Sequence, residues 1–91
     1  LMASGRSLQV EVVSHEGRLW HGSAASVQIP TVDGSLGVLP GRQPLLAQLG
    51  EGAVTVTRSD EVTSFTVSGG FASVDNDYVT IVADHAIVVV Q

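Results

Sequence analysis

The sequence predicts an all-β fold, and three features of the residue pattern indicate it. Apolar and polar residues alternate with a period of two along most of the chain, whereas helical periodicity is nearly absent. Turn-forming residues recur at intervals of about 8–12 residues, which is typical of a sandwich or a barrel of short strands. The segments between the turns are rich in Val, Thr and Ile, whose branched side chains fit a pleated, half-buried surface.

Three strands are predicted in the first third of the chain. In residues 8–12, Leu and Val alternate with Gln and Glu, and residues 15–17 form a turn into a second strand at residues 18–21. A third strand at residues 26–29 is expected to end at Pro30, because proline donates no hydrogen bond to a neighbouring strand.

Residues 31–44 interrupt the alternation. Here we expect a structured loop with short extended pieces, because glycine permits unusual backbone angles and close approach to another chain. The glycines and prolines of this segment are Gly34, Gly37, Pro40, Gly41 and Pro44.

The second half of the chain alternates again and contains five further predicted strands. They cover residues 45–49, 54–57, 61–67, 71–74 and 78–83. Ser68–Gly70 and Asp75–Asp77 are expected to reverse the chain between the last three strands. Residues 86–91 are uncharged and almost entirely apolar, which indicates a buried strand or an aggregation-prone segment.

Length and composition limit the classes of protein that the chain can belong to. With 91 residues it holds one domain, for which we assign residues 8–91, with residues 1–7 as a leader. The chain contains nine acidic residues, four arginines and no lysine. The resulting net charge of −5 opposes binding to nucleic acid or to an anionic bilayer. Charged residues make up only 14% and hydrophobic residues 44%, so we expect the apolar surface to be covered by a second chain, by a membrane, or by a fold that buries it unusually well.

Residues that could carry chemistry do not form a recognisable motif. The chain has no cysteine, and His15, His21 and His85 do not stand at metal-ligand spacing. Ser68, Asp84 and His85 are the residue types of a hydrolase triad, but no nucleophile elbow surrounds the serine. The sequence therefore predicts no catalytic residue and no metal site.

Two further turns, one rich in glycine and one rich in acidic residues, also lack a complete binding motif. Gly34–Gly37 lacks the lysine and the helix N-terminus of a phosphate-binding loop. Asp75–Asp77 lacks the twelve-residue loop and terminal Glu of a calcium site, so these residues are interpreted as turn formers. We expect no cofactor.

Two valines break the alternation and point to a surface. Val13 is out of phase with Val10 and Val12, and Val82 is out of phase with its neighbours, so both are predicted to face away from the core. Such residues mark a candidate partner site, because soluble monomers rarely expose large apolar patches. Alternatively, both sheet faces are partly covered within the domain itself.

Three stretches resemble the epsilon subunit family of F-type ATP synthases. Residues 34–46 (GSLGVLPGRQPLL) are similar to the family's GELGILPGHAPLL, and residues 68–71 (SGGF) with residues 79–84 (VTIVAD) are similar to SGGF and VTVLAD. Residues 8–17 (LQVEVVSHEG) resemble the family's opening strand and turn. The three stretches occur in the family's order and the resemblance runs from about Leu8 to Ala86.

Departures from the family pattern fall at a few positions. Ser35 replaces the usual Glu, Arg42 the usual His and His15 the usual Pro. Family members usually continue after the Ala-Asp segment into a two-helix domain that carries inhibition of ATP hydrolysis and, in some, nucleotide binding. Neither activity is assigned to residues 1–91.

The resemblance implies a flattened two-sheet antiparallel β-sandwich of about ten short strands at the foot of the central stalk. It implies a non-catalytic rotor subunit that couples the gamma subunit to the membrane c ring during ATP synthesis. The complex lies on the cytoplasmic face of the bacterial plasma membrane or the equivalent organelle membrane. By matching positions, the residues that face the c ring are Asp33, Ser35 and Leu36, and those that face gamma are Ser14, Arg42 and Ala47.

Two other functions remain open at this stage. The first is a stand-alone β-sandwich module that binds another protein, for which the resemblance is only architectural. The second and weaker one is a small hydrolase that uses Ser68 and His85. Co-purification with gamma and the c ring separates the rotor subunit from both.

Overall fold

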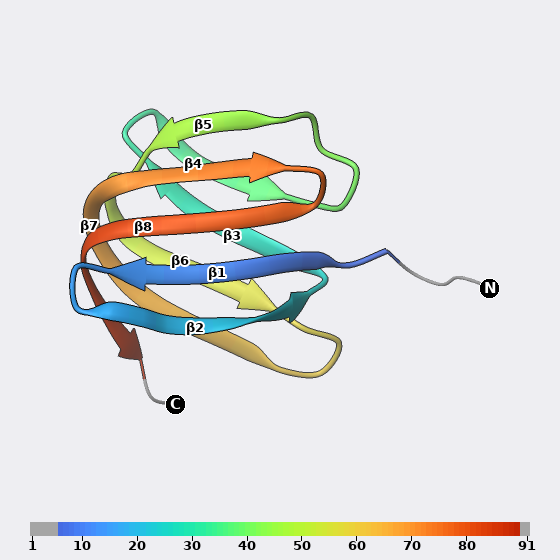
Figure 1. The fold of residues 1–91 in the computed structure, drawn as a ribbon, viewed down its shortest axis with the longest axis horizontal. Helices are drawn as coiled ribbons and strands as arrows, with labels where there is room; N and C mark the ends of the chain where they lie inside the picture. The colour runs from blue at the N-terminus through green and yellow to red at the C-terminus, as the bar shows by residue number, and fades with distance from the viewer. Residues whose placement is uncertain (1–5, 90–91) are drawn as a thin grey trace.

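A computed structural model describes residues 6–89, which form eight strands and no helix. Within these residues there is accordingly no helix that could span a membrane. The strands are β1 (Leu8–Ser14), β2 (Gly17–Ala24), β3 (Ser26–Thr31), β4 (Gly34–Val38), β5 (Leu45–Gln48), β6 (Glu51–Thr57), β7 (Val62–Asp75) and β8 (Tyr78–Val89) (Figure 1). The predicted all-β class is confirmed.

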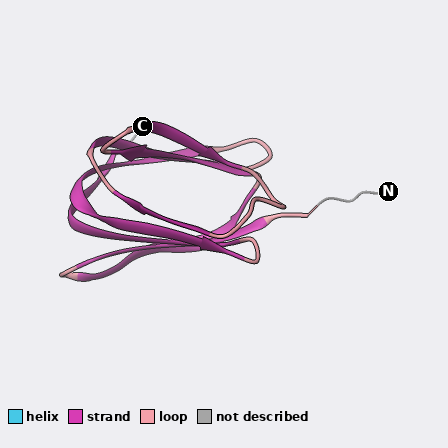
Figure 2. Cartoon of the chain, turned by 90° about the horizontal axis from the view of Figure 1, so that it is seen from above, coloured by secondary structure: helices cyan, strands magenta, loops and turns pink. Residues whose placement is uncertain are grey.

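The eight strands form one hydrogen-bonded sheet that folds over into two layers (Figure 2). The strand order is β2-β1-β8-β7-β6-β3-β4, and β5 pairs with β7 outside this path. The first layer contains β2, β1, the first half of β8, the second half of β7, and β5. The second layer contains β4, β3, β6 and the remaining halves of β7 and β8. Only β1 and β8 pair in parallel.

Strands β7 and β8 pass from one layer to the other, which corrects the prediction that Ser68–Gly70 reverses the chain. Pairing is interrupted at one position of each strand, between Ser68 with His85 and Gly70 with Ala83, and resumes in the same register, so Gly69 and Asp84 lie opposite each other without pairing. Gly69 and Gly70 have φ angles of 72° and 107°, which only glycine adopts readily. The two glycines bend the strand and do not end it. Residues 6–89 therefore form eight strands, whereas the resemblance implied about ten short ones.

Two smaller corrections concern the first half of the chain. Strand β3 does not end at Pro30 but continues to Thr31. The proline is tolerated because β6 pairs only with Ser26–Gln28, so the missing N–H of Pro30 removes no hydrogen bond to β6. The segment 31–44 contains a full strand, β4, which forms a hairpin with β3. The residues of this segment outside strands are the two-residue turn at 32–33 and the loop at 39–44.

The end of β8 is more exposed than the predicted buried strand. Residues 85–89 pair with β7 on one side only, and Ile87 and Val88 are 69% and 43% exposed. Residues 90 and 91 of this predicted strand, like residues 1–5 of the predicted leader, lie outside the described residues.

The core between the layers is aliphatic except for one aromatic ring. Phe65 is completely buried, and Trp20 of β2 contacts it edge-on with ring centroids 6.3 Å apart. The Arg58 guanidinium lies 5.9 Å from the Trp20 ring. Among residues 6–89 no polar or charged side chain is buried, so burial of apolar surface supplies most of the stabilisation. The buried residues are Leu8, Val10, Val12, Ala24, Val27, Ile29, Val38, Leu49, Val54, Val56, Phe65, Val67, Ala72, Val74, Val79, Ile81 and Ala83.

Candidate interaction surfaces

Three apolar side chains form a row across the outer face of the first layer. Val13 of β1 pairs with Val82 of β8, and Val82 pairs with Phe71 of β7. The two valines are half-buried, whereas Phe71 is 47% exposed. The prediction that Val13 and Val82 face away from the core is confirmed, and the register places them next to each other.

Strand β5 extends this row at the edge of the layer. Leu46 pairs with Ser73, which lies two residues from Phe71 on the same face, and its side chain is 72% exposed. We call Val13, Val82, Phe71 and Leu46 the apolar patch. Beside it, Arg18 Nε donates to Glu11 Oε2 at 2.9 Å. A patch of this kind with a charged border is characteristic of a protein-binding surface.

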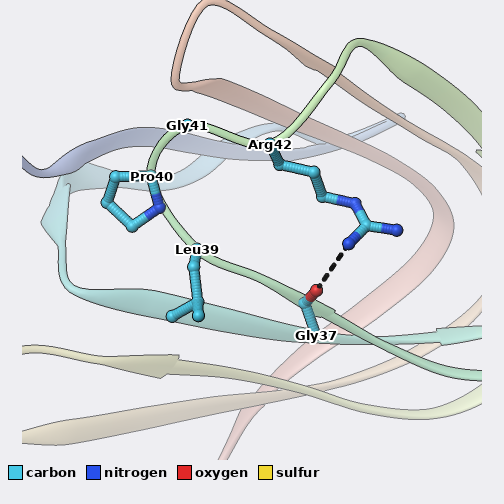
Figure 3. Close-up of a pocket in the computed structure, with 5 residues that line it drawn as sticks. All are labelled: Gly37, Leu39, Pro40, Gly41 and Arg42. Atoms are coloured by element: carbon cyan, nitrogen blue, oxygen red, sulfur yellow. Dashed lines mark hydrogen bonds between the residues drawn. The ribbon is translucent and has the colours of Figure 1, made fainter.

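The residues predicted to face gamma lie along this layer but do not form one cluster. Ser14 follows Val13, and Ala47 follows Leu46 but points inward and pairs with the buried Ala72. Arg42 belongs to the loop between β4 and β5, at the opposite end of the strands from Ser14 (Figure 1). Arg42 is held locally, since its Nη1 donates to the Gly37 carbonyl at 3.4 Å (Figure 3).

The residues predicted to face the c ring lie on the β3–β4 hairpin. Asp33 is exposed in the turn, and Ser35 is exposed beside it, where its hydroxyl accepts a hydrogen bond from Gln28 Nε2 at 2.6 Å. Leu36 instead packs against the core and pairs with the buried Ile29. The turn also presents Val32, which is 56% exposed.

Hydrogen bonds fix this hairpin turn in one conformation. Thr31 Oγ1 donates to the Gly34 carbonyl at 2.6 Å and accepts from the Asp33 amide at 3.1 Å. The Val32 amide donates to the Gln48 carbonyl at 3.1 Å, and the Gly50 amide to the Pro30 carbonyl at 3.1 Å. The turn is therefore tied to the β5–β6 connection.

At the other end of the molecule, Asp77 ties three segments together. Its carboxylate accepts from the Gly41 amide at 2.7 Å and from Arg6 Nη2 at 2.7 Å and Nε at 3.1 Å. Asp77 and Asn76 occupy a tight turn with positive φ angles of 64° and 51°, which Asp and Asn tolerate. The hydrogen bond from Gly41, together with Arg6, lowers the pKa of Asp77 below 3.8, against a smaller opposing effect of burial.

We expect Asp77→Asn to lower stability at neutral pH and to lose this effect in acid. Asparagine keeps the turn conformation and an acceptor for Gly41, but it removes the negative charge that holds Arg6. Because the folded-state pKa is depressed, the carboxylate stabilises the fold above pH 3.8, and this contribution is lost as the pH falls through the lowered value. Urea midpoints of both proteins at pH 7 and pH 2.5 measure the difference. A gap that is equal at both pH values would contradict the assignment.

The residue types of a hydrolase triad do not meet as a triad. Ser68 and His85 are paired in register, but the Ser68 hydroxyl donates to Glu51 Oε2 at 3.4 Å. The His85 ring instead packs against His15. Among residues 6–89, no three His, Asp or Glu side chains are arranged to hold a metal ion.

Comparison with known proteins places the chain in a family. The family described as "ATP synthase, Delta/Epsilon chain, beta-sandwich domain" matches residues 7–89. The chain belongs to this family. The ATP synthase epsilon chain of Micrococcus luteus is 48% identical over 80 residues, covering 87% of this chain and 88% of that one. The epsilon chain of Corynebacterium diphtheriae is 46% identical over 83 residues, covering 88% and 67%. The resemblance inferred from the three sequence stretches is therefore confirmed.

Solved structures support the same fold. A chain of the Euglena gracilis mitochondrial ATP synthase, solved as OSCP, F1 and c-ring, superposes with a TM-score of 0.83 at 24% identity, covering 97% of this chain and 59% of that one. A chain of the Tetrahymena thermophila mitochondrial ATP synthase central stalk and c-ring gives 0.76 at 15% identity, covering 93% and 69%. At such identities these two structures establish the fold alone.

Within this delta/epsilon β-sandwich domain, the sequence pattern identified only half of the apolar patch. It found Val13 and Val82 because each breaks the alternation of its own strand. It missed Phe71, because the positions that point inward change at the bend of Gly69 and Gly70, from Phe65 and Val67 before it to Ala72 after it. Leu46 was missed because its neighbours are also apolar, so no alternation marks its face.

Proposed function

We propose that this domain is a non-catalytic rotor subunit of a proton-translocating F-type ATP synthase, in the central stalk between the gamma subunit and the membrane c ring. The observation that carries the proposal is membership of the delta/epsilon β-sandwich family over residues 7–89, together with 48% identity to an epsilon chain of comparable length. The domain needs no cofactor for this role. Its task is mechanical, and a close-packed sandwich transmits torque without yielding.

In this proposal the outer face of the first layer binds gamma. The apolar patch provides the centre of the contact, with Ser14 at its border. Ala47 points inward and supports β5 beneath Leu46. A partner that extends along the strands also reaches Arg42. The net charge of −5 and the exposed apolar side chains both favour a protein partner over nucleic acid or lipid headgroups.

The β3–β4 hairpin turn meets the c ring. Asp33 and Ser35 provide polar contacts there, and Leu36 supports the hairpin from beneath. Hydrogen bonds to the β5–β6 connection fix the turn, so little conformational entropy is lost on docking. The domain then associates with the membrane only through the ring, on the cytoplasmic face of a bacterial plasma membrane or the equivalent organelle face.

Co-purification tests the proposal. An affinity-tagged chain produced in its native cells is recovered from detergent-solubilised membranes, and gamma and c subunits are expected in the same fraction. Recovery of the chain alone from the soluble fraction would overturn the proposal and favour a stand-alone protein-binding module.

A substitution in the β3–β4 turn tests the proposed contact with the c ring. Val32→Asp places a second carboxylate in the turn and is expected to reduce recovery of the c ring at least about fivefold, while gamma is retained. Leu39→Asp is the matched control, because Leu39 is similarly exposed at 63% but lies in the β4–β5 loop at the other end. Equal recovery of the c ring with both variants would show that the turn is not the contact.

A further inference from the structure

The fold brings together two histidines that are far apart in sequence. His15 lies in the β1–β2 turn and His85 in β8, and the pairing of Ser14 with Ala83 places these segments side by side. Both side chains are exposed, and their ring centroids are 5.5 Å apart with the ring planes at 87°. The corner where β7 and β8 change layers therefore presents two imidazoles to solvent.

A hydrogen bond fixes which nitrogen of His15 carries its proton. His15 Nδ1 lies 2.8 Å from the backbone carbonyl oxygen of Asp84. Because a carbonyl oxygen only accepts, Nδ1 must be the donor, and in the neutral ring Nε2 keeps its lone pair. Histidines that bind metal ions commonly have this arrangement, in which one ring nitrogen donates to a carbonyl and the other faces the metal.

The separation of the two rings matches that of two imidazoles on one metal ion. A Zn–N bond of ~2.0–2.1 Å places a ring centroid about 3.2 Å from the ion, so two ligating rings at tetrahedral or trigonal angles have centroids ~5.2–5.5 Å apart. The observed 5.5 Å lies at the upper end of this range. Neighbouring acidic residues Glu16 and Asp84 and the net charge of −5 favour a cation here.

We propose that His15 and His85 form a two-imidazole site for a divalent late transition-metal cation, Zn²⁺, Ni²⁺ or Cu²⁺. Imidazole nitrogen suits these ions, whereas Mg²⁺ and Ca²⁺ prefer oxygen ligands. Water fills the other coordination positions, because no third protein ligand of the described residues joins the pair. The site is therefore an exchangeable one and does not hold a structural metal.

Titration of the full chain with ZnCl₂ and NiCl₂ tests the site. Calorimetry is expected to give one ion per chain, and Ni²⁺ is expected to broaden NMR signals around residues 14–16 and 84–86. His15→Asn and His85→Ala are each expected to weaken binding at least about tenfold. Asparagine at position 15 keeps a donor for the Asp84 carbonyl, so this variant removes the ligand without releasing the turn. His21→Ala is the control, since His21 is an exposed histidine on β2.

Thermal unfolding gives a second readout, because an ion that binds only the folded chain raises Tm. The rise is expected in the wild type and in His21→Ala, and is expected to disappear in the two corner variants. Absence of binding at millimolar metal, wild-type affinity in His85→Ala, or equal weakening in His21→Ala would each overturn the proposal. These measurements use the isolated chain and are independent of its assembly into an ATP synthase.

Discussion

Gly70→Ala is expected to abolish stable folding of this domain. A Cβ atom at this position would lie 2.0 Å from the Val82 carbonyl oxygen and 2.9 Å from Ala83 Cα, both of which are backbone atoms of the paired strand. The φ angle of 107° adds strain for any residue with a side chain. The strand pair must then separate where β7 and β8 turn between the layers. The cost, at least ~4 kcal/mol, is comparable to the total stability of about 5–14 kcal/mol for a domain of this size.

Two matched variants separate the steric clash from backbone strain. Gly34 has a φ of 122° but nothing within 4 Å of an added Cβ, so Gly34→Ala costs only the strain of ~1–3 kcal/mol. Gly37 has open space and no positive φ, so Gly37→Ala is expected to be nearly neutral. Urea unfolding followed by circular dichroism and Trp20 fluorescence measures all three. If Gly70→Ala loses no more stability than Gly34→Ala, the close approach of β7 and β8 at Gly70 is not essential.

Much of the fold could be predicted because each strand carries its own signal. The alternation that places Leu8, Val10 and Val12 inward is a local property, and the structure buries all three. The same alternation identified Val13 and Val82 as outward residues. The Asp75–Asp77 turn was predictable as well, because Asn and Asp tolerate the positive φ angles found there.

The features that escaped prediction depend on which strands become neighbours. Continuation of β7 through Ser68–Gly70 could not be distinguished from a turn, since a glycine pair permits both. The bond between Asp77 and the Gly41 amide, and the contact of His15 with His85, exist only because the topology brings remote segments together. The sequence pattern around each of these residues carries no sign of its partner.

Phe71→Glu is expected to prevent association of the domain with gamma while leaving the domain folded. Phe71 is the only aromatic member of the apolar patch, and aromatic anchors dominate the binding energy of protein interfaces. Glutamate there would bring an unpaired carboxylate into the contact. Its desolvation costs far more binding free energy than the loss of the apolar contact of Phe71. We expect at least ~2 kcal/mol, or about thirtyfold weaker binding. Because Phe71 is 47% exposed in the free domain, the stability of the isolated chain should change little.

Thr66→Glu is the matched control for this prediction. Thr66 is exposed on the same strand, β7, but lies before the bend at Gly69 and Gly70 and therefore in the second layer. The two variants have the same charge and differ in the face that carries the new carboxylate. Recovery of gamma with tagged Thr66→Glu and its loss with tagged Phe71→Glu would locate the interface on the first layer. The reverse result would place gamma on the second layer, where Thr66 pairs with Ala53 and the exposed Ile87, and the apolar patch would then have to serve a different partner.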